Sequence, residues 1–212
     1  MHITSRFTRY FLIISLLIAC LLILMTVLLL RGSLPQYDGE TALPQLSAPV
    51  FADRDELGSV TLTGENRLDL AMAMGYIHAQ ERFFEMDLMR RQAAGELSEL
   101  FGSTAITHDR KARHFRMRAR ALAVLNQLPA EQRQLLEVYR IGVNRGISAL
   151  TIHPFPYLLT QTRPAVWQNE DSILVIFAMF FTLNETSIYR ELKLSSMRAT
   201  LPDSVYQFLT MH

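Results

Sequence analysis

The chain has 212 residues, half of them apolar, and its 21 lysine and arginine residues nearly balance 20 aspartate and glutamate residues. A net charge of +1 gives no basis for a nucleic-acid partner or a strongly acidic one, and neither is expected. The single cysteine, Cys20, excludes a disulfide within the chain. The length suffices for one to one and a half domains.

The N-terminus has the composition of a membrane anchor. Residues 1–10 contain Arg6 and Arg9 and no acid, and residues 11–30 contain no charged residue. Twenty helical residues span about 30 Å, the thickness of a bilayer core. We expect a cytoplasmic basic leader at 1–10, a transmembrane anchor at 11–30 and export of the remainder. Arg31 follows the run directly without a small-residue cleavage site, which favours an uncleaved anchor.

Cys20 allows a second interpretation of the same segment. Residues 17–20, LIAC, are similar to a bacterial lipoprotein cleavage box, in which Cys20 would be lipidated. The ten apolar residues that follow favour a spanning helix, because a lipoprotein normally turns polar there. Cys20 is then a small apolar residue of that helix.

Prolines at positions 35, 44 and 49 predict an extended linker over residues 31–47. The main region follows over 48–212. It opens with alternating, β-branched residues around Glu56-Leu57-Gly58, which predict a short β-hairpin near residues 48–64.

The remainder is expected to be mainly α-helical. Asn66 or Asp69 caps a helix whose core face is predicted from apolar residues at helical spacing, namely Leu70, Met74, Ile77, Phe84 and Leu88. Further helices are expected at 110–126 and 130–149, and a proline-containing loop at 153–167. An apolar core helix at 171–183, too short to span a membrane, precedes a helix at 188–209 broken at Pro202.

Taken singly, the polar residues indicate no active site. His78 and Glu85 are seven positions apart, an awkward spacing for one metal, so His78 is expected to be packed and hydrogen-bonded at the edge of a core. The arginines at 90–91 and the acids Glu96 and Glu99 are expected to form ion pairs. No serine, threonine or cysteine has an evident base beside it.

Longer motifs run through the chain in a fixed order: Ala48-Pro49-Val50 and Asp53–Gly58, GYIHAQERFFEMD over 75–87, RRQAAGELSELFG over 90–102, Tyr139 with Gly142-Val143-Asn144, and Pro164, Trp167 and Glu170-Asp171-Ser172. In this order they resemble the penicillin acylase (penicillin amidase) family over about residues 34–209.

The resemblance implies the αββα fold of the N-terminal nucleophile hydrolases, made as one precursor and cut into an α and a β chain. The serine that begins β attacks an amide carbonyl with its own α-amine as base. The chain ends at His212, so we expect it to be the α-chain region of an incomplete domain, with no catalytic residue of its own, inactive alone and paired with the β chain of the same precursor.

The resemblance also implies substrate-binding residues. A late α-chain helix in the family lines the acyl pocket with a methionine and, four positions on, an apolar residue. Alignment on the methionine gives Met179 and Leu183, with Phe180 beside them. Thr182 stands where the best-known members often have arginine, so the acyl preference is open. The alternative is that Met179, Phe180 and Leu183 are core residues.

Family members often bind one structural calcium ion, with one α-chain carboxylate. When the family's calcium-ligand position is aligned without gaps, it falls on Tyr189, which is no ligand. A two-residue gap places it on Glu191, and Glu185 is a third possibility. Glu191 is the candidate ligand. The remaining oxygens would come from the β chain. No organic cofactor is implied.

The expected function is therefore the N-terminal part of a bacterial inner-membrane acylase with its body in the periplasm. Its substrates would be small N-acyl amides of the penicillin type or the acyl-homoserine lactone type. The alternative is a truncated, inactive remnant or a binding module, whose helix at 173–183 would expose a large apolar surface.

Overall fold

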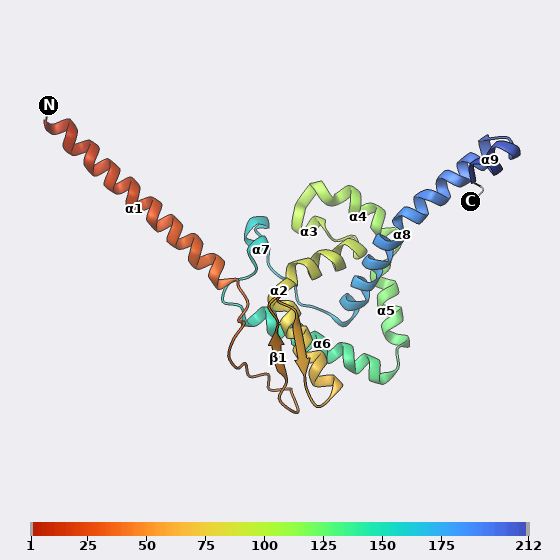
Figure 1. Ribbon diagram of the computed structural model, residues 1–212, viewed down its shortest axis with the longest axis horizontal. Coiled ribbons are helices and arrows are strands. Elements are labelled where there is room, and N and C mark those ends of the chain that lie inside the picture. Colours follow the sequence, from red (N-terminus) through yellow and green to blue (C-terminus); the bar gives the residue numbers. More distant parts are fainter. Residues whose placement is uncertain (1, 211–212) are drawn as a thin grey trace.

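The computed structural model describes the backbone of residues 2–210 and the side chains of residues 10–184 and 187–210. It is mostly helical with one antiparallel hairpin (Figure 1). Its elements in chain order are α1 (His2–Gly32), β1 (Phe51–Arg54), β2 (Val60–Thr63), α2 (Arg67–Ala94), α3 (Ser98–Phe101), the 3-10 helix η1 (Gly102–Ala105), α4 (Ile106–Arg113), α5 (Met117–Gln127), α6 (Ala130–Ala149), α7 (Phe155–Thr160), α8 (Asn169–Thr200) and α9 (Asp203–Thr210).

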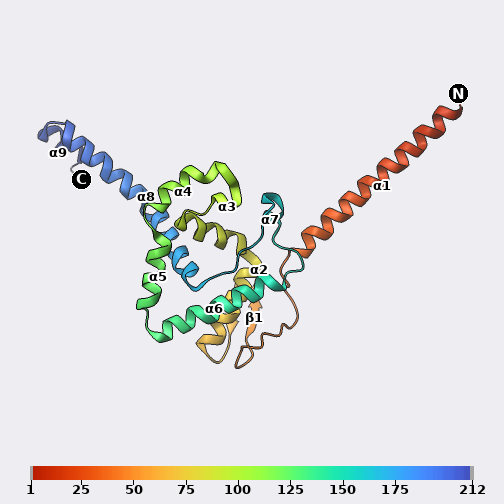
Figure 2. The same cartoon turned by 180° about the vertical axis from the view of Figure 1, so that it is seen from behind.

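Helix α1 extends away from the body of the protein (Figures 1 and 2). Its 23 residues Tyr10–Gly32 are long and apolar enough to cross a membrane, and none of them is buried. The side chains of Arg6 and Arg9 lie outside the described residues. The two arms of α8, Asn169–Asn184 and Ser187–Thr200, pass the same test only when joined across a bend of 43°.

The segment after α1 is fastened to the body at both ends. The amide of Ile152 donates to the carbonyl of Gly32 at 2.9 Å. At the far end, the amides of Ser47 and Ala48 both donate to the carboxylate of Asp69 at 3.0 Å. The linker therefore follows the surface of the body.

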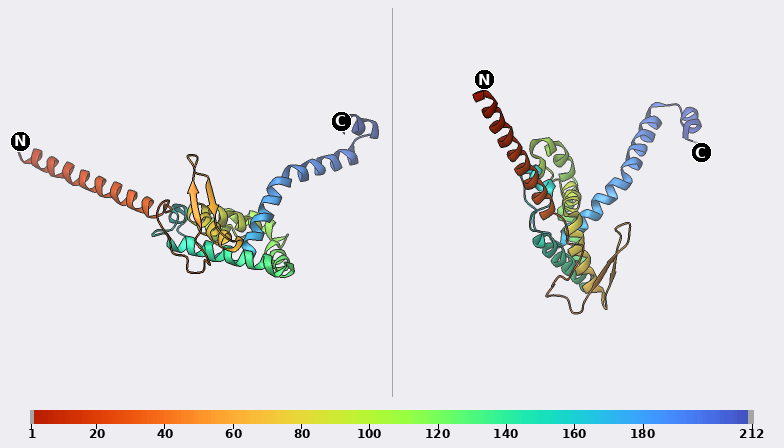
Figure 3. Two further views of the ribbon diagram at one scale, coloured as in Figure 1. Left: turned by 60° about the horizontal axis from the view of Figure 1, so that its bottom comes forward. Right: turned by 60° about the vertical axis from the view of Figure 1, so that its left-hand side comes forward.

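The hairpin has the predicted position and turn. Phe51 pairs with Thr63 and Arg54 with Val60 in antiparallel register. The carboxylate of Asp55 accepts from the amide of Ser59 at 2.7 Å, and Gly58 has a φ of 81°, which favours glycine. The hairpin extends from the body as a separate arm (Figure 3).

Helices α2 and α6 form the centre of the fold through close backbone contact. A Cβ on Gly142 would lie 2.0 Å from the Met72 carbonyl oxygen, and one on Gly146 would lie 2.3 Å from that of Tyr76. From the other side, a Cβ on Gly75 would lie 2.3 Å from the Tyr139 oxygen. Three glycines therefore let the two backbones approach. Around them lies a core cluster of Ala79, Phe83, Met86, Leu100, Val143, Ile147, Tyr157 and Trp167.

The predicted core face of α2 is wrong in part. Asn66 is the N-cap, as expected, and its side chain accepts from the Asp69 amide. Phe84 and Leu88 pack at the edge of the core, but Met74 is 43% exposed. The fully buried stripe instead includes Met72 and the charged residues Asp87, Arg90 and Arg91.

Three other helix predictions need correction. The basic stretch 110–126 is two helices, because Arg116 adopts a left-handed conformation with φ of 52° between α4 and α5. The predicted loop 153–167 contains α7, because Pro156 fits the first helical turn. The two helices predicted at 171–183 and 188–209 join in one element, α8, whose two arms meet at a 43° bend between Asn184 and Ser187. The predicted break at Pro202 is confirmed, since α9 follows it.

Candidate functional site

A buried network of charges joins α2 to the segments around it. Asp87 is fully buried and accepts from Arg90 Nε at 2.7 Å, Arg91 Nε at 2.8 Å and the Tyr157 hydroxyl at 2.7 Å. Burial and the charge of Asp87 raise the pKa of Tyr157, so the phenol keeps the proton that it donates. Arg91 also pairs with Glu99, which confirms one of the ion pairs expected from the sequence.

The same network fixes the start of α8. Asp171 is fully buried and accepts from Arg90 and, at 3.1 Å, from Arg118. It also accepts from the Gln168 amide at 2.7 Å and so completes a capping box. Arg118 in turn binds Glu96 through both carboxylate oxygens. Because a buried carboxylate with these partners cannot shift freely, the direction in which α8 leaves the body is set by charged contacts.

Helix α8 is buried in its first turns only. Ile173, Leu174 and Ala178 belong to a second core cluster with Ala93, Ala94 and Ala121. Beyond Ala178 most of the apolar side chains are exposed, so the prediction of a core helix at 171–183 holds for one face of its first half. The other face and the second half of this segment form an exposed apolar surface, as the alternative interpretation of the helix at 173–183 predicts.

The three predicted substrate-binding residues lie on this exposed part. Met179 is 50% exposed, Phe180 59% and Leu183 74%. Met179 and Leu183 are four positions apart on one helix face. Within the described residues, packing inside this chain does not account for them.

A small cavity of about 400 Å³ lies on another side of α8. It is lined by Gln92, Phe181, Thr182, Ile188, Tyr189 and Leu192. Met179, Phe180 and Leu183 do not line it, so the structure does not bring the predicted acyl-pocket residues into this cavity.

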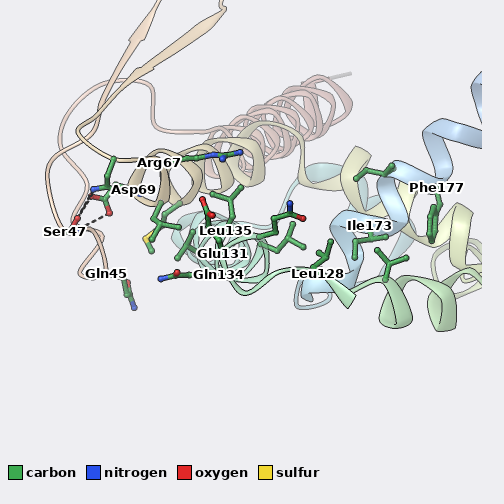
Figure 4. Close-up of a pocket in the computed structure, with 18 residues that line it drawn as sticks. Gln45, Ser47, Arg67, Asp69, Leu128, Glu131, Gln134, Leu135, Ile173 and Phe177 are labelled. Carbon is green, nitrogen blue, oxygen red and sulfur yellow. Dashed lines mark hydrogen bonds between the residues drawn. The ribbon is translucent and has the colours of Figure 1, made fainter. Parts of the chain in front are cut away.

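A larger groove of about 980 Å³ runs from the start of α2 along α6 to α8 (Figure 4). Ser47 and Asp69 lie at one end, Glu131 in the middle, and Ile173 and Phe177 at the other end. One end therefore suits polar groups and the other an apolar chain. The sequence predicted no such groove, because four separate segments form it and no single motif marks it.

The groove contains one serine beside a carboxylate, but it is no catalytic pair. The Ser47 hydroxyl donates to Asp69 at 2.6 Å. This hydrogen bond, with further ones from the Ser47 and Ala48 amides and from Asn66, lowers the pKa of Asp69 to about 2. A carboxylate so acidic is too weak a base to activate a hydroxyl. The pair instead holds the linker against the start of α2.

His78 packs as the sequence predicted. Its Nδ1 lies 3.1 Å from the Tyr139 hydroxyl, and burial, with the charge of Arg82, lowers its pKa. Burial also raises the pKa of Tyr139 to about 12. Both groups are therefore neutral at pH 7 and form a structural contact.

The candidate calcium ligand has no partners in the part of the chain that the structure describes. Glu191 is exposed on α8, and the described residues contain no group of three His, Cys, Asp or Glu side chains that could hold a metal ion. The side chain of Glu185 lies outside the described residues. Since calcium needs six or more oxygens, these residues alone do not fit it.

Sequence comparison finds relatives that are named as acylases. It is 33% identical over 147 residues to penicillin acylase 2 proenzyme of a Pseudomonas species, covering 69% of this chain and 19% of that protein. It is 34% identical over 154 residues to the acyl-homoserine lactone acylase QuiP of Pseudomonas aeruginosa, covering 71% and 18% respectively. The chain thus spans less than a fifth of the length of these curated relatives.

Structural comparison supports the same assignment. The thermostable penicillin G acylase of Alcaligenes faecalis superposes with a TM-score of 0.62 at 18% identity, covering 77% of this chain and 92% of that chain. The described chain therefore shares the fold of that penicillin G acylase chain. Residues 49–210 match the family model described as penicillin amidase. That match spans most of the molecule outside α1, and the chain therefore belongs to the penicillin amidase family.

Proposed function

We propose that the chain is the N-terminal, α-chain part of a membrane-anchored acylase precursor. The complete enzyme cleaves a small N-acyl amide through an acyl-enzyme on the N-terminal serine of a second chain. The match of residues 49–210 to the family carries this proposal. Within the described residues, the Ser47–Asp69 pair of the groove holds the linker and is too weakly basic to compete with such a serine.

The role of this chain is to present one wall of the acyl pocket. Met179 and Leu183 are exposed on α8, and the Asp171 network fixes that helix at its start. An apolar wall on a rigid element suits an acyl chain, which binds by burial of its surface. The second chain would complete the pocket.

Names of the relatives suggest the substrate class. They are a penicillin acylase and an acyl-homoserine lactone acylase, and both substrate types contain an acyl group on an amide nitrogen. Thr182 beside the predicted pocket residues leaves the acyl group itself open.

The proposed location is the bacterial inner membrane. Tyr10–Gly32 would span the bilayer, and Arg6 and Arg9 would keep the N-terminus cytoplasmic, which places the body in the periplasm. Lipidation of Cys20 is the alternative anchor. A structural calcium ion with Glu191 as one ligand would require oxygens from the second chain, and no step depends on it.

The test is to express the complete coding region of the locus, including whatever follows the codon for residue 212. Mass spectrometry should find two chains, the second beginning with serine. The product should release the acyl group from phenylacetyl amides or from acyl-homoserine lactones. An unprocessed single chain with neither activity would support the inactive remnant or binding module instead.

Met179→Ala in the active protein tests the pocket assignment. Removing the thioether should change the preference among acyl chain lengths far more than the rate on small acyl groups, because a long chain loses more contact. The ratio of kcat/KM values for long and short acyl substrates measures this. Met74→Ala, at a methionine of similar exposure on α2, should leave that ratio unchanged. If both variants keep the wild-type profile, Met179 does not line the pocket.

A further inference from the structure

Helix α7 presents apolar side chains to the outside of the molecule. Phe155 is 51% exposed, Leu158 44% and Leu159 77%; these three residues are called the α7 patch below. Between them, Tyr157 is fully buried and donates its hydroxyl to Asp87 at 2.7 Å. The buried Tyr157 therefore anchors this short helix to the core, and the exposed face of the helix has a fixed position.

Helix α7, which carries this patch, lies near the C-terminal end of α1 (Figures 1 and 2). Ile152, three residues before α7, donates its amide to the carbonyl of Gly32 at 2.9 Å. Its side chain also fills the space next to that glycine, where a Cβ would lie 2.8 Å from Ile152 Cδ1. The end of α1 and the start of α7 therefore form one packed corner.

Further contacts of the linker keep the body close to this corner. The amide of Gln36 donates to the side-chain oxygen of Gln80 on α2 at 3.1 Å. The guanidinium of Arg54 lies 4.6 Å from the centre of the Tyr37 ring. The body is thus not a domain on a free tether, and it cannot turn α7 away from the end of α1 without breaking these contacts.

The two chain segments that meet at the corner contain arginines and no acidic residue. No aspartate or glutamate occurs between Glu137 and Glu170, nor between the N-terminus and Asp38. Arg31, at the end of α1, and Arg145 and Arg163, in the segments that flank α7, are exposed. Exposed apolar side chains in a segment with exposed arginines and no acid have the composition of surfaces that bind anionic lipid bilayers.

We propose that the α7 patch inserts into the headgroup–acyl boundary of the bilayer that α1 spans, as a second contact of the protein with the membrane. The proposal rests on the proposed anchoring through α1. A helix that crosses the bilayer and ends at Gly32 brings the packed corner to the membrane surface. The α7 patch then lies at that level, and the arginines face the phospholipid phosphates. The body is held in one orientation on the membrane.

The test uses the full chain in lipid nanodiscs that contain phosphatidylglycerol. An environment-sensitive fluorophore is attached at Leu158→Cys in a Cys20→Ser background. The matched control is Leu122→Cys on α5, which lies at the opposite end of the body and has similar exposure, 42% against 44%. The probe at position 158 should emit at shorter wavelength and lose intensity when shallow doxyl-labelled lipids are included. The probe at position 122 should show neither change.

The native Cys20, labelled in the wild-type chain, reports separately on the anchor, because it lies in the middle of α1. If the probe at 20 is quenched by deep doxyl lipids while the probe at 158 is unaffected, the anchor stands and the α7 contact is wrong. A blue-shifted but unquenched probe at 158 would mean that protein covers α7, which also overturns the proposal. A water-exposed probe at 20 would overturn the anchor and the α7 contact together.

Discussion

Charged side chains occupy the centre of the contact between α2, α7 and α8. Asp87 and Asp171 are both fully buried, and Arg90, 4% exposed, bridges them while its guanidinium lies 5.1 Å from the Trp167 ring centre. A buried charge is tolerated only when its partners are complete. Each member of this network therefore depends on the others, and a single truncation should have a large effect.

Asp87→Ala should destabilise the protein by about 3–5 kcal/mol, because the buried Nε groups of Arg90 and Arg91 both lose their acceptor and part of the charge that balances them. Tyr157→Phe removes only one hydrogen-bond donor to Asp87 and should lower the stability by about 1 kcal/mol. Urea unfolding of the full chain in detergent, followed by far-ultraviolet circular dichroism, measures both. Equal losses in the two variants would mean that the carboxylate contributes no more than an ordinary hydrogen bond.

Asp69 predicts a pH dependence at the linker. Its pKa in the folded protein is about 2, below the ordinary value of 3.8. The folded state therefore binds its proton less readily, so the contribution of Asp69 to stability is complete above the ordinary pKa and is lost as pH falls through about 2. The amide resonances of Ser47 and Ala48 should shift in this window. In Asp69→Asn that shift should be absent; its persistence would assign the titration to another group.

At the level of the elements, α2 shows what hydrophobic periodicity can predict and what it cannot. The helix, its cap at Asn66 and the hairpin before it follow from local signals. Its buried face does not, because Asp87, Arg90 and Arg91 lie inside and satisfy one another there. A periodicity that counts apolar residues alone assigns these three positions to the surface and Met74 to the core.

The local sequence signals for α7 and α8 are misleading for a related reason. Pro154 and Pro156 indicated a loop, although proline at a first helical turn removes no needed donor. The polar pair at 184–185 indicates a helix end, and α8 does bend by 43° between Asn184 and Ser187, but it continues to Thr200. The acyl-pocket assignment came from the resemblance, and the groove between α2, α6 and α8 had no sequence signal.

Gly142→Ala tests the close packing of α2 against α6. Helix propensity alone favours alanine by about 1 kcal/mol. The new Cβ, however, would lie 2.0 Å from a backbone oxygen of Met72, so the two helices would have to separate. We expect a net destabilisation of about 2 kcal/mol. Ser148→Ala, at an exposed position of the same helix, should be nearly neutral, and the two variants can be compared by thermal unfolding. A stabilised Gly142→Ala protein would show that the backbones are not in contact.

The whole molecule has an apolar surface that nothing in the described chain covers. Beyond Ala178, the exposed side chains of α8 include Met179, Phe180, Leu183, Ile188 and Leu192. Patches of this kind mark an interface or cause aggregation. In the acylase proposal the second chain covers this surface.

Residues 32–212 produced alone should therefore be insoluble or molten. Met179→Lys with Leu183→Glu should raise the soluble fraction and reduce binding of the dye ANS, because the patch is interrupted by charge. Leu57→Glu, at the exposed hairpin turn, adds a charge elsewhere and should not help. A cooperative thermal transition of the unmodified fragment would contradict the need for a covering chain.

The pairing of α2 with α6 also fixes the order in which the core can form during synthesis. Helix α2 leaves the ribosome before α3, α4 and α5. The face of α2 around Gly75 has no partner until Gly142 and Gly146 of α6 have been synthesised. Throughout that interval Asp87, Arg90 and Arg91 are in water, where charged groups are most stable. The unfinished chain therefore exposes less apolar surface than an all-hydrocarbon core would. The same buried charges that make this core difficult to predict from apolar periodicity help to keep the nascent chain soluble.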